Sequence, residues 1–265
     1  MEILSFDIEG KFAHFRKFHG NNTALSYAIP PRTTIMGILA AICGEEKDSY
    51  YEDFNSENLK VGIRVMSNLK KSFHRLNLLM IKSQDDFRGQ KGRVQTPFEI
   101  VTGENISSDK VIYRIYLNPA GNQKVFERIK KNLLNTQPTF NLSLGIANFS
   151  ASVSKVTYYK EINQIKAKNE WVELDSAGNS DQIEEIEFDE NISFKLNHIE
   201  EELMPADFVE NFNRELLQMN RVLFATQPFP LRVKLTGDYF KVTSESKETE
   251  TIQFLEYAGL LSQQS

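Results

Sequence analysis

The sequence predicts an α+β protein of two parts, a ferredoxin-like domain at residues 1–150 and a smaller, strand-rich domain at residues 151–265. Three observations predict it. Apolar and polar residues alternate in several short segments of the first part, and two other segments repeat apolar residues at helical spacing. Their order is strand, helix, strand, strand, helix, strand, which is typical of ferredoxin-like domains. After residue 151 the patterns are weaker and mostly strand-like.

The first strand and the first helix have the clearest signals. Residues 4–8 alternate apolar and polar side chains, which indicates a half-buried strand, and Gly10 then marks a bulge or a close approach of another backbone. Two prolines end the loop that follows. The apolar spacing after them predicts a helix that Thr33 or Thr34 caps and that stops at Gly44.

Three further strands and a second helix complete the first domain. Alternation predicts strands at residues 61–65 and 111–117, and an amphipathic helix is expected at residues 125–133. A last strand is expected at residues 140–144. Between the second and third strands lies an unusually long excursion, residues 67–110.

The second domain has fewer signals. Residues 222–224 and 231–235 are predicted to be strands. Before them, Phe208, Phe212 and Leu216 recur at helical spacing and predict a short helix.

Charge is distributed unevenly along the chain, whose formal net charge is −5. Residues 1–150 hold 20 Lys and Arg against 15 Asp and Glu, whereas residues 151–265 hold 11 against 21. Nine basic residues fall within 60–93, and thirteen acidic residues fall within 173–210. A basic first half could bind a polyanionic ligand while the acidic second half contacts other proteins. The alternative, that both halves simply carry solvated charged surfaces, fits the charge distribution equally well. We expect the acidic run to be a solvated loop rather than a docking site.

Several classes of function lack their sequence signals. The one cysteine, Cys43, lies among apolar residues, so no internal disulfide forms and a buried thiol is expected rather than a nucleophile. The chain has no phosphate-binding loop, dinucleotide fingerprint or paired metal motif, so neither a cofactor nor a metal is expected. The longest apolar run, residues 35–43, is too short to span a membrane, and acidic residues near the start argue against a signal peptide. A cytoplasmic protein is therefore expected.

Basic and aromatic residues are interleaved in two segments. This combination suits single-stranded nucleic acid, because cations follow the phosphates and aromatic faces stack on unpaired bases. The alternative is a solvated basic hairpin whose aromatic residues form its own small core. The residues that carry the signal are Phe15, Arg16, Lys17, Phe18, Tyr27 and Arg32 in the first loop, and Lys70, Lys71, Phe73, His74, Arg75, Phe87, Arg88, Lys91 and Arg93 in the excursion.

An acid/base site for RNA cleavage is a competing hypothesis. Cleavage through the 2′-hydroxyl needs a base, an acid and a cation, but no metal. His14, Tyr27, Lys71 and His74 have suitable side chains. No spacing ties them into one constellation, so the sequence leaves this alternative open.

The stretch FDIEGKFAHFRKF, followed by SYAIPPRTTIMGILAAICG, resembles the N-terminus of the Cas-five family, CRISPR-associated subunits of the type I Cascade complex within the RAMP superfamily. GRVQTPFEIV with VIYRIYLN is similar to the family's return from a thumb-like hairpin, and LSLGIANFSASV to its fourth-strand segment. MPADFVENFNR is similar to a segment of type I-B members. The residues that match the N-terminal pattern are Gly10, Ala13, Phe15, Arg16, Ser26, Tyr27, Pro30, Pro31, Thr33, Thr34 and Gly37.

The resemblance implies a ferredoxin-like RNA-binding domain with a thumb at about residues 67–110. It implies a non-catalytic subunit that binds the 5′ handle of the crRNA and caps the backbone filament in antiviral defence. The implied partners are backbone subunits of the Cas-seven family and a large subunit of the Cas-eight family, with target DNA met only through the complex.

Two other functions stay open beside this one. Type I-C members cleave the repeat RNA themselves with Tyr, His and Lys residues, and this sequence does not show their His–Lys pair convincingly. A metal-independent endoribonuclease that processes CRISPR repeat RNA is therefore the alternative. A protein-interaction module whose basic hairpin docks an acidic partner is the third.

The residues expected to contact the handle belong to the proline-bounded loop or to the thumb. We expect these two segments to converge on one trough for single-stranded RNA. The residues are Gly10, Lys11, Arg16, Lys17, Tyr27 and Arg32 in the loop, and Lys71, His74, Arg75, Arg88, Lys91 and Arg93 in the thumb.

Overall fold

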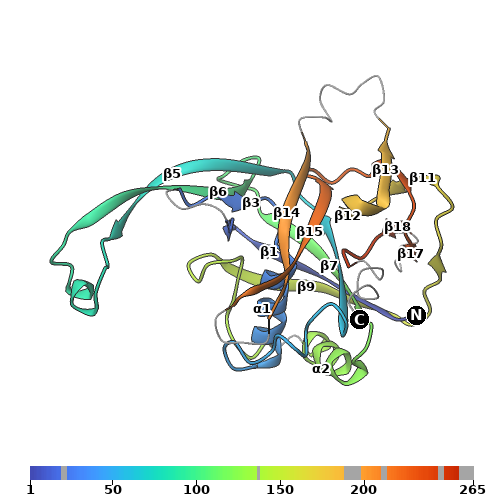
Figure 1. Ribbon diagram of the computed structural model, residues 1–265, viewed down its shortest axis with the longest axis horizontal. Helices are drawn as coiled ribbons and strands as arrows, with labels where there is room; N and C mark the ends of the chain where they lie inside the picture. Colours follow the sequence, from blue (N-terminus) through green and yellow to red (C-terminus); the bar gives the residue numbers. More distant parts are fainter. Residues whose placement is uncertain (19–22, 136–137, 188–197, 210–213, 244–247, 257–265) are drawn as a thin grey trace.

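The structure is a computed structural model that describes residues 1–18, 23–135, 138–187, 198–209, 214–243 and 248–256. A five-stranded antiparallel sheet lies at its centre (Figure 1). Its strands are β1 (Ile3–Gly10), β4 (Leu59–Val65), β7 (Val111–Pro119), β8 (Leu142–Ser143) and β9 (Ser150–Tyr159), in the order β4-β7-β1-β9-β8.

Both faces of the central sheet are covered. Helices α1 (Arg32–Cys43) and α2 (Gln123–Leu134) pack against one face, where Leu4, Phe6 and Ile8 of β1 join their core. C-terminal strands cover the other face. Even the polar residues of β1 are enclosed there, with Ser5 at 2% and Asp7 at 1% exposed. The prediction of a half-buried first strand was therefore wrong, because the second half of the chain folds back over it.

Helix α1 begins two to three residues earlier than expected. Its N-cap is Pro31, with no side-chain capping bond, so the prediction that Thr33 or Thr34 caps the helix was wrong. Proline suits this position because it has no N–H to leave unpaired. The predicted stop is confirmed, since Gly44 adopts a left-handed conformation with φ of 77° and donates its N–H to the Ala40 carbonyl.

The predicted strand at residues 140–144 is reduced to two residues. Phe140 is 52% exposed, and only Leu142–Ser143 pairs with a neighbouring strand. The chain then turns at Gly145, whose φ is 93° and where a Cβ would lie 1.9 Å from the His14 carbonyl oxygen. The long strand beside β1 is instead β9, which the sequence reading missed.

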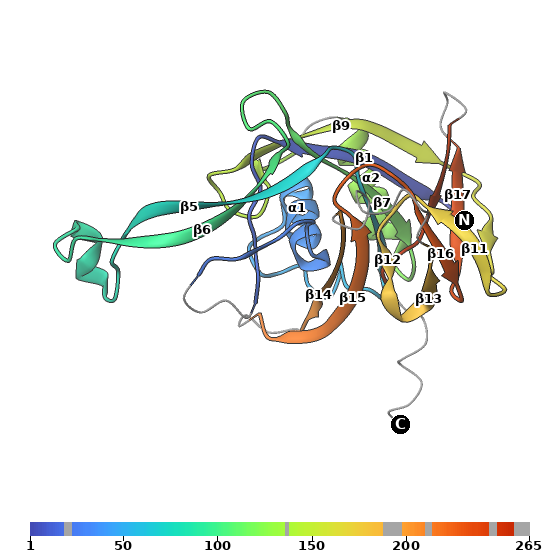
Figure 2. The same cartoon turned by 90° about the horizontal axis from the view of Figure 1, so that it is seen from above.

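A two-stranded hairpin projects far from the body of the molecule (Figures 1 and 2). It consists of β5 (Leu69–Leu79) and β6 (Arg93–Gly103), joined at the tip by the 3-10 helix η1 (Gln84–Arg88). We call residues 69–103 the thumb hairpin. It occupies the predicted excursion.

The first loop packs along the base of the thumb hairpin. Ala13 exchanges backbone hydrogen bonds with Val101 at 2.8 and 2.9 Å, and the N–H of Glu99 donates to the Ala24 carbonyl at 2.9 Å. Within this loop the short strands β2 (Phe15–Arg16) and β3 (Ser26–Tyr27) pair with each other. The loop and the hairpin thus lie side by side, as expected.

The described residues of the second half form three small antiparallel sheets. Their orders are β10-β17-β18, β11-β16-β13 and β12-β15-β14. The elements are β10 (Gln164–Ile165), β11 (Glu170–Leu174), β12 (Gly178–Asn179), η2 (Ser180–Gln182), β13 (Ile183–Ile186), β14 (Ile199–Phe208), β15 (Leu216–Ala225), β16 (Leu231–Leu235), β17 (Tyr239–Thr243) and β18 (Thr249–Ile252).

The helix predicted around Phe208, Phe212 and Leu216 was wrong. Phe208 ends β14 and Leu216 begins β15, and these two residues face each other in the strand register. Phe212 lies outside the described residues. The helical spacing was accidental, because Phe208 and Leu216 belong to two different strands that pair with each other.

The two halves share one core. Met204, Val222 and Phe224 of the second half join the same apolar cluster as β1 and both helices. None of the helices in the described ranges is long and apolar enough to cross a membrane.

Candidate nucleic-acid interface

The thumb hairpin has two faces of different character, because successive residues of a strand point to opposite sides. The register of β5 and β6 runs without a bulge. One side carries Lys71, Phe73 and Arg75, and we call it the open face. The other side carries His74 and Phe98. Phe73 is 61% exposed, and Arg75 is exposed.

The base of the hairpin contributes to a small apolar cluster. Phe98 packs there with Phe12 and Phe149. Because Phe12 and Phe149 lie outside the hairpin, this cluster is not the separate aromatic core of the hairpin that the alternative describes. It does not extend to Phe73 or to Phe87, which is 68% exposed near the tip.

The tip is ordered around one carboxylate. Asp86 accepts the backbone N–H groups of Lys82 and Ser83 at 2.7 and 2.8 Å, and Lys91 Nζ lies 2.9 Å from the same oxygen. These donors, Lys91 first, hold the pKa of Asp86 below its usual range. The predicted contact residue Lys91 thus has an internal partner, while Arg88 and Arg93 are exposed nearby.

The loop cations occupy different environments. Arg16 is exposed. Lys11 Nζ lies 3.2 Å from the Asp109 carbonyl oxygen, and Lys17 forms an ion pair with Glu202. The two lysines are partly buried, so only Arg16 of the three stands fully in solvent.

The acidic run is not a single solvated loop, which corrects that expectation. Its residues 188–197 lie outside the described residues, but its other parts contribute to strands β11 to β14. Strand β14 lies beside the loop and the hairpin, where Glu200 forms an ion pair with Lys71 at 2.8 Å and Glu202 pairs with Lys17.

Arg32 belongs to the interior, so its predicted contact with RNA is wrong. Its side chain is 1% exposed. Nη1 lies 2.6 Å from Asp207, Nε lies 2.6 Å from Glu256, and Nη2 donates to the carbonyls of Phe54 and Leu59 at 2.8 and 2.6 Å. The guanidinium therefore joins α1 to the second half of the chain.

Gly10 and Tyr27 are also internal, which corrects their assignment to the surface. A Cβ on Gly10 would lie 2.8 Å from the Ser150 carbonyl oxygen, so this glycine permits the close pairing of β1 with β9. Tyr27 is 2% exposed, and its hydroxyl donates to the Leu203 carbonyl at 3.0 Å.

The four acid/base candidates occupy separate environments. Lys71 lies on the open face of the hairpin and His74 on the opposite one, where its Nε2 is 3.0 Å from the Ser72 hydroxyl. The hydroxyl of Tyr27 donates a hydrogen bond to the Leu203 carbonyl inside the protein. His14 is 2% exposed, stacks on Phe98 with centroids 4.0 Å apart, and places Nδ1 2.7 Å from the Glu99 carbonyl.

His14 gives a pH-dependent prediction. Burial lowers the pKa of its imidazole, although the bond to the Glu99 carbonyl acts in the opposite direction. As the pH falls, the imidazole therefore takes up a proton in the unfolded chain before it does so in the folded chain. The contribution of neutral His14 to stability is present above about pH 6.5 and is lost as the pH falls below this value. We expect the melting temperature of His14→Gln to fall less than that of the wild type between pH 7.5 and 5.5. Equal losses would exclude this role.

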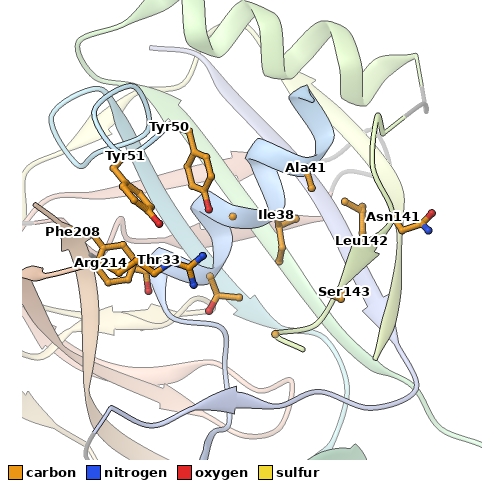
Figure 3. A pocket seen from close by; sticks show the side chains of 13 residues that line it. Thr33, Ile38, Ala41, Tyr50, Tyr51, Asn141, Leu142, Ser143, Phe208 and Arg214 are labelled. Carbon is orange, nitrogen blue, oxygen red and sulfur yellow. The ribbon is translucent and has the colours of Figure 1, made fainter. Parts of the chain in front are cut away.

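A cavity of about 330 Å³ opens beside α1 (Figure 3). Tyr50 and Phe208 line one side and Ile38 the other. Arg214 also lines it and pairs with Asp48 at 2.8 Å. None of the predicted RNA contacts, all of which are described residues, lines this cavity. It is therefore separate from the basic surface.

The described residues contain no group of three His, Cys, Asp or Glu side chains placed to hold a metal ion. Cys43 is partly buried, and burial raises the pKa of its thiol to about 11, which leaves little thiolate at neutral pH.

Two features of the surface escaped the sequence reading. The tip of the hairpin exposes apolar side chains beside its cations, and the apolar run LNLLMI, which lies between charged residues, could have predicted this. Glu200 and Glu202 were recognised only as part of the acidic run. No local pattern shows that these two glutamates pair with lysines far away in the sequence. The exposed apolar residues of the tip are Leu78, Leu79, Ile81, Phe87 and Val94, each 43–68% exposed.

Comparisons with known proteins identify the family of the chain. A family model described as "CRISPR-associated protein (Cas_Cas5)" matches residues 3–204. No curated protein matches the chain at a significant level. A CRISPR protein from Archaeoglobus fulgidus is similar in structure, with a TM-score of 0.56 and 14% identity over 95% of this chain and 98% of the other, which indicates a shared fold. A chain of a "CRISPR RNA-guided surveillance complex" has a TM-score of 0.47 and 12% identity over 87% and 91%.

Proposed function

Because the chain belongs to the Cas-five family of CRISPR-associated proteins, we propose that it is the subunit of a type I Cascade complex that binds the 5′ handle of the crRNA. The observation that carries this proposal is the thumb hairpin, a long projection with exposed cations and aromatic rings. Exposed apolar side chains gain nothing from folding, so the exposure of Phe73 and Phe87 supports a binding surface on the hairpin.

We assign the first half of the chain to the ferredoxin-like class. Strand β1, helix α1, strands β4 and β7, helix α2 and strand β9 follow one another in the order typical of that class. The neighbours of β1 in the sheet are β7 and β9, so each helix crosses between strands that are not adjacent. The thumb hairpin is then an insertion between the second and third strands of this domain.

The RNA path runs along the open face of the hairpin and onto the first loop. Exposed cations along this path, Arg16, Arg75, Arg88 and Arg93, hold the phosphates. Phe73 offers a face on which an unpaired base stacks. Guanidinium groups suit this task, because their planar donors match phosphate oxygens.

The subunit acts without catalysis of its own. Lys71 and His74 project from opposite sides of the hairpin, and the imidazole of His14 and the hydroxyl of Tyr27 are engaged with backbone carbonyls. A base, an acid and a cation must act on one phosphate, and this geometry does not favour such a site. Incubation with repeat RNA in EDTA tests the endoribonuclease alternative, since a 2′,3′-cyclic phosphate product would contradict our proposal.

The partners are the neighbouring subunits of the complex. The apolar tip of the hairpin fits a backbone subunit of the Cas-seven family, because exposed apolar groups beside charges mark protein contacts. A large subunit of the Cas-eight family is the second partner, and the assembly of type I-B is the one we favour. The complex works in the cytoplasm.

Direct binding of single-stranded RNA tests the proposal. If about six phosphates are neutralised, the logarithm of the affinity falls with the logarithm of salt concentration with a slope of roughly −4. Raising salt from about 50 to about 200 mM should then weaken binding by a few hundred-fold. Fluorescence anisotropy with a labelled repeat-derived strand measures this slope. A slope near zero would contradict the proposal, and a protein that binds its partners after nuclease treatment with no RNA would favour the interaction module.

A further inference from the structure

Strand β14 brings two carboxylates against two lysines of the proposed RNA path. Glu202 pairs with Lys17 of the first loop, and Glu200 Oε2 lies 2.8 Å from Lys71 Nζ on the open face of the hairpin. The side chains of these four residues are only 18–28% exposed. Partly buried ion pairs are screened less by salt than pairs in open solvent. In the free protein the positive charge of each lysine is therefore largely balanced by its glutamate.

The two carboxylates have the regular spacing of a strand. Glu200 and Glu202 are two residues apart, so they project from the same side of β14, about 6.6 Å from each other. Glu201 projects from the other side, where it pairs with Arg221 at 2.9 Å. An extended backbone that carries negative charges at regular intervals presents the same chemistry to a row of cations as a single strand of RNA.

Aromatic side chains flank both lysines. Phe18 follows Lys17 and is 59% exposed, and Phe73 shares the open face with Lys71 and is 61% exposed. Lys17 Nζ also lies 5.4 Å from the centre of the Tyr27 ring. Lys71 therefore has an exposed aromatic ring on its own side of the hairpin, and an exposed phenylalanine follows Lys17 in the chain. A cation with an aromatic face nearby is the combination that holds a phosphate and stacks its base. Among the described residues, each of these lysines forms its ion pair with a carboxylate of β14.

We propose that β14 is an internal competitor for RNA, in which Glu200 and Glu202 occupy the places that phosphates of the bound strand take at Lys71 and Lys17. This rests on the proposed function. Binding exchanges each carboxylate for a phosphate, and this exchange weakens the binding of every RNA by the same factor. Short or arbitrary RNAs, which bind weakly already, are then left unbound at concentrations at which an RNA with further contacts along the hairpin still binds.

Charge-removing substitutions on three consecutive residues of β14 test the proposal. Glu200→Gln and Glu202→Gln should each tighten the binding of a labelled ten-nucleotide oligouridine by about fivefold, because the lysine no longer has to leave a carboxylate. Glu201→Gln removes the same charge from the same strand but faces Arg221, and it should change the affinity by less than about twofold. The full chain is used, and thermal melts confirm that each variant is folded.

The pairing itself is tested in a Lys71→Met background. There, Glu200→Gln should bring no gain, because the carboxylate has no lysine to release, while Glu202→Gln keeps its gain. Equal tightening by all three glutamines, or none, overturns the proposal even if the wild type binds RNA well. If neither the wild type nor any variant binds the probe, the proposed function itself fails, and this inference fails with it.

Discussion

Arg32→Met is expected to lower the free energy of unfolding by about 3–5 kcal/mol, the largest loss of stability of any single change considered for this chain. Breaking a buried pair by removal of one partner is costly, because the other charge stays behind without compensation. Here two carboxylates, Asp207 and Glu256, would be left, and both are 2.6 Å from the guanidinium. Urea unfolding followed by circular dichroism measures the change.

Glu256 shows why this network depends on its arginine. Burial raises the pKa of its carboxyl, against the lowering effect of Arg32. Without the guanidinium, that carboxylate must either stay ionised in an apolar site or take up a proton, and both outcomes cost stability.

Arg214→Met is the matched control for this experiment. Arg214 also pairs with an aspartate, at 2.8 Å from Asp48, but its side chain is 51% exposed. An exposed pair contributes at most about 1 kcal/mol, so its removal should lower stability far less. Similar losses of unfolding free energy in the two variants would mean that the buried network stabilises the fold no more than an exposed ion pair does. If Arg32→Met does not fold, Arg32→Lys keeps the charge and tests the lost hydrogen bonds.

The fold was predictable where a pattern was local. The first strand, both helices and the strands at residues 61–65 and 111–117 lie where their periodicity predicted them. The periodicity could not show that both faces of β1 are buried, because residues from the second half of the chain cover its polar face. Strand β9 was missed, since its apolar residues are separated by Ser and Lys and Phe140 gave a stronger but misleading signal. Strand β14 was missed for a related reason, because three consecutive glutamates conceal its alternation.

The surface was predictable only in outline. The sequence identified the cations of the loop and of the hairpin, and most hairpin cations are exposed. It could not tell which cations have internal partners, because those partners are remote in sequence. Arg32 and Asp207 are separated by 175 positions, and Lys17 and Glu202 by 185. A charge becomes a ligand contact or a structural pair only when the whole chain has folded.

Reversal of three hairpin cations should have the largest effect on binding. Arg75, Arg88 and Arg93 are exposed along the hairpin, so Arg75→Glu, Arg88→Glu and Arg93→Glu together should weaken single-stranded RNA binding by about 100-fold or more at moderate salt. The loss of three phosphate contacts should also make the slope of the logarithm of affinity against the logarithm of salt concentration less negative by roughly 2. Stability should change little, since exposed side chains contribute little to it. Anisotropy titrations at several salt concentrations measure both effects.

The control for this variant changes the net charge by the same amount elsewhere. Lys124 and Lys131 are exposed residues of α2, and the exposed Lys47 follows α1 closely in the chain. Figure 1 shows both helices on the body of the molecule, far from the tip of the hairpin. The joint reversal of these three lysines to glutamate adds the same negative charge to the chain, but it removes no cation from the proposed RNA path. If binding depended only on net charge, both triple variants would lose affinity equally. A loss confined to the hairpin variant would instead locate the RNA on the thumb, because screening limits the reach of charges beyond about 10 Å.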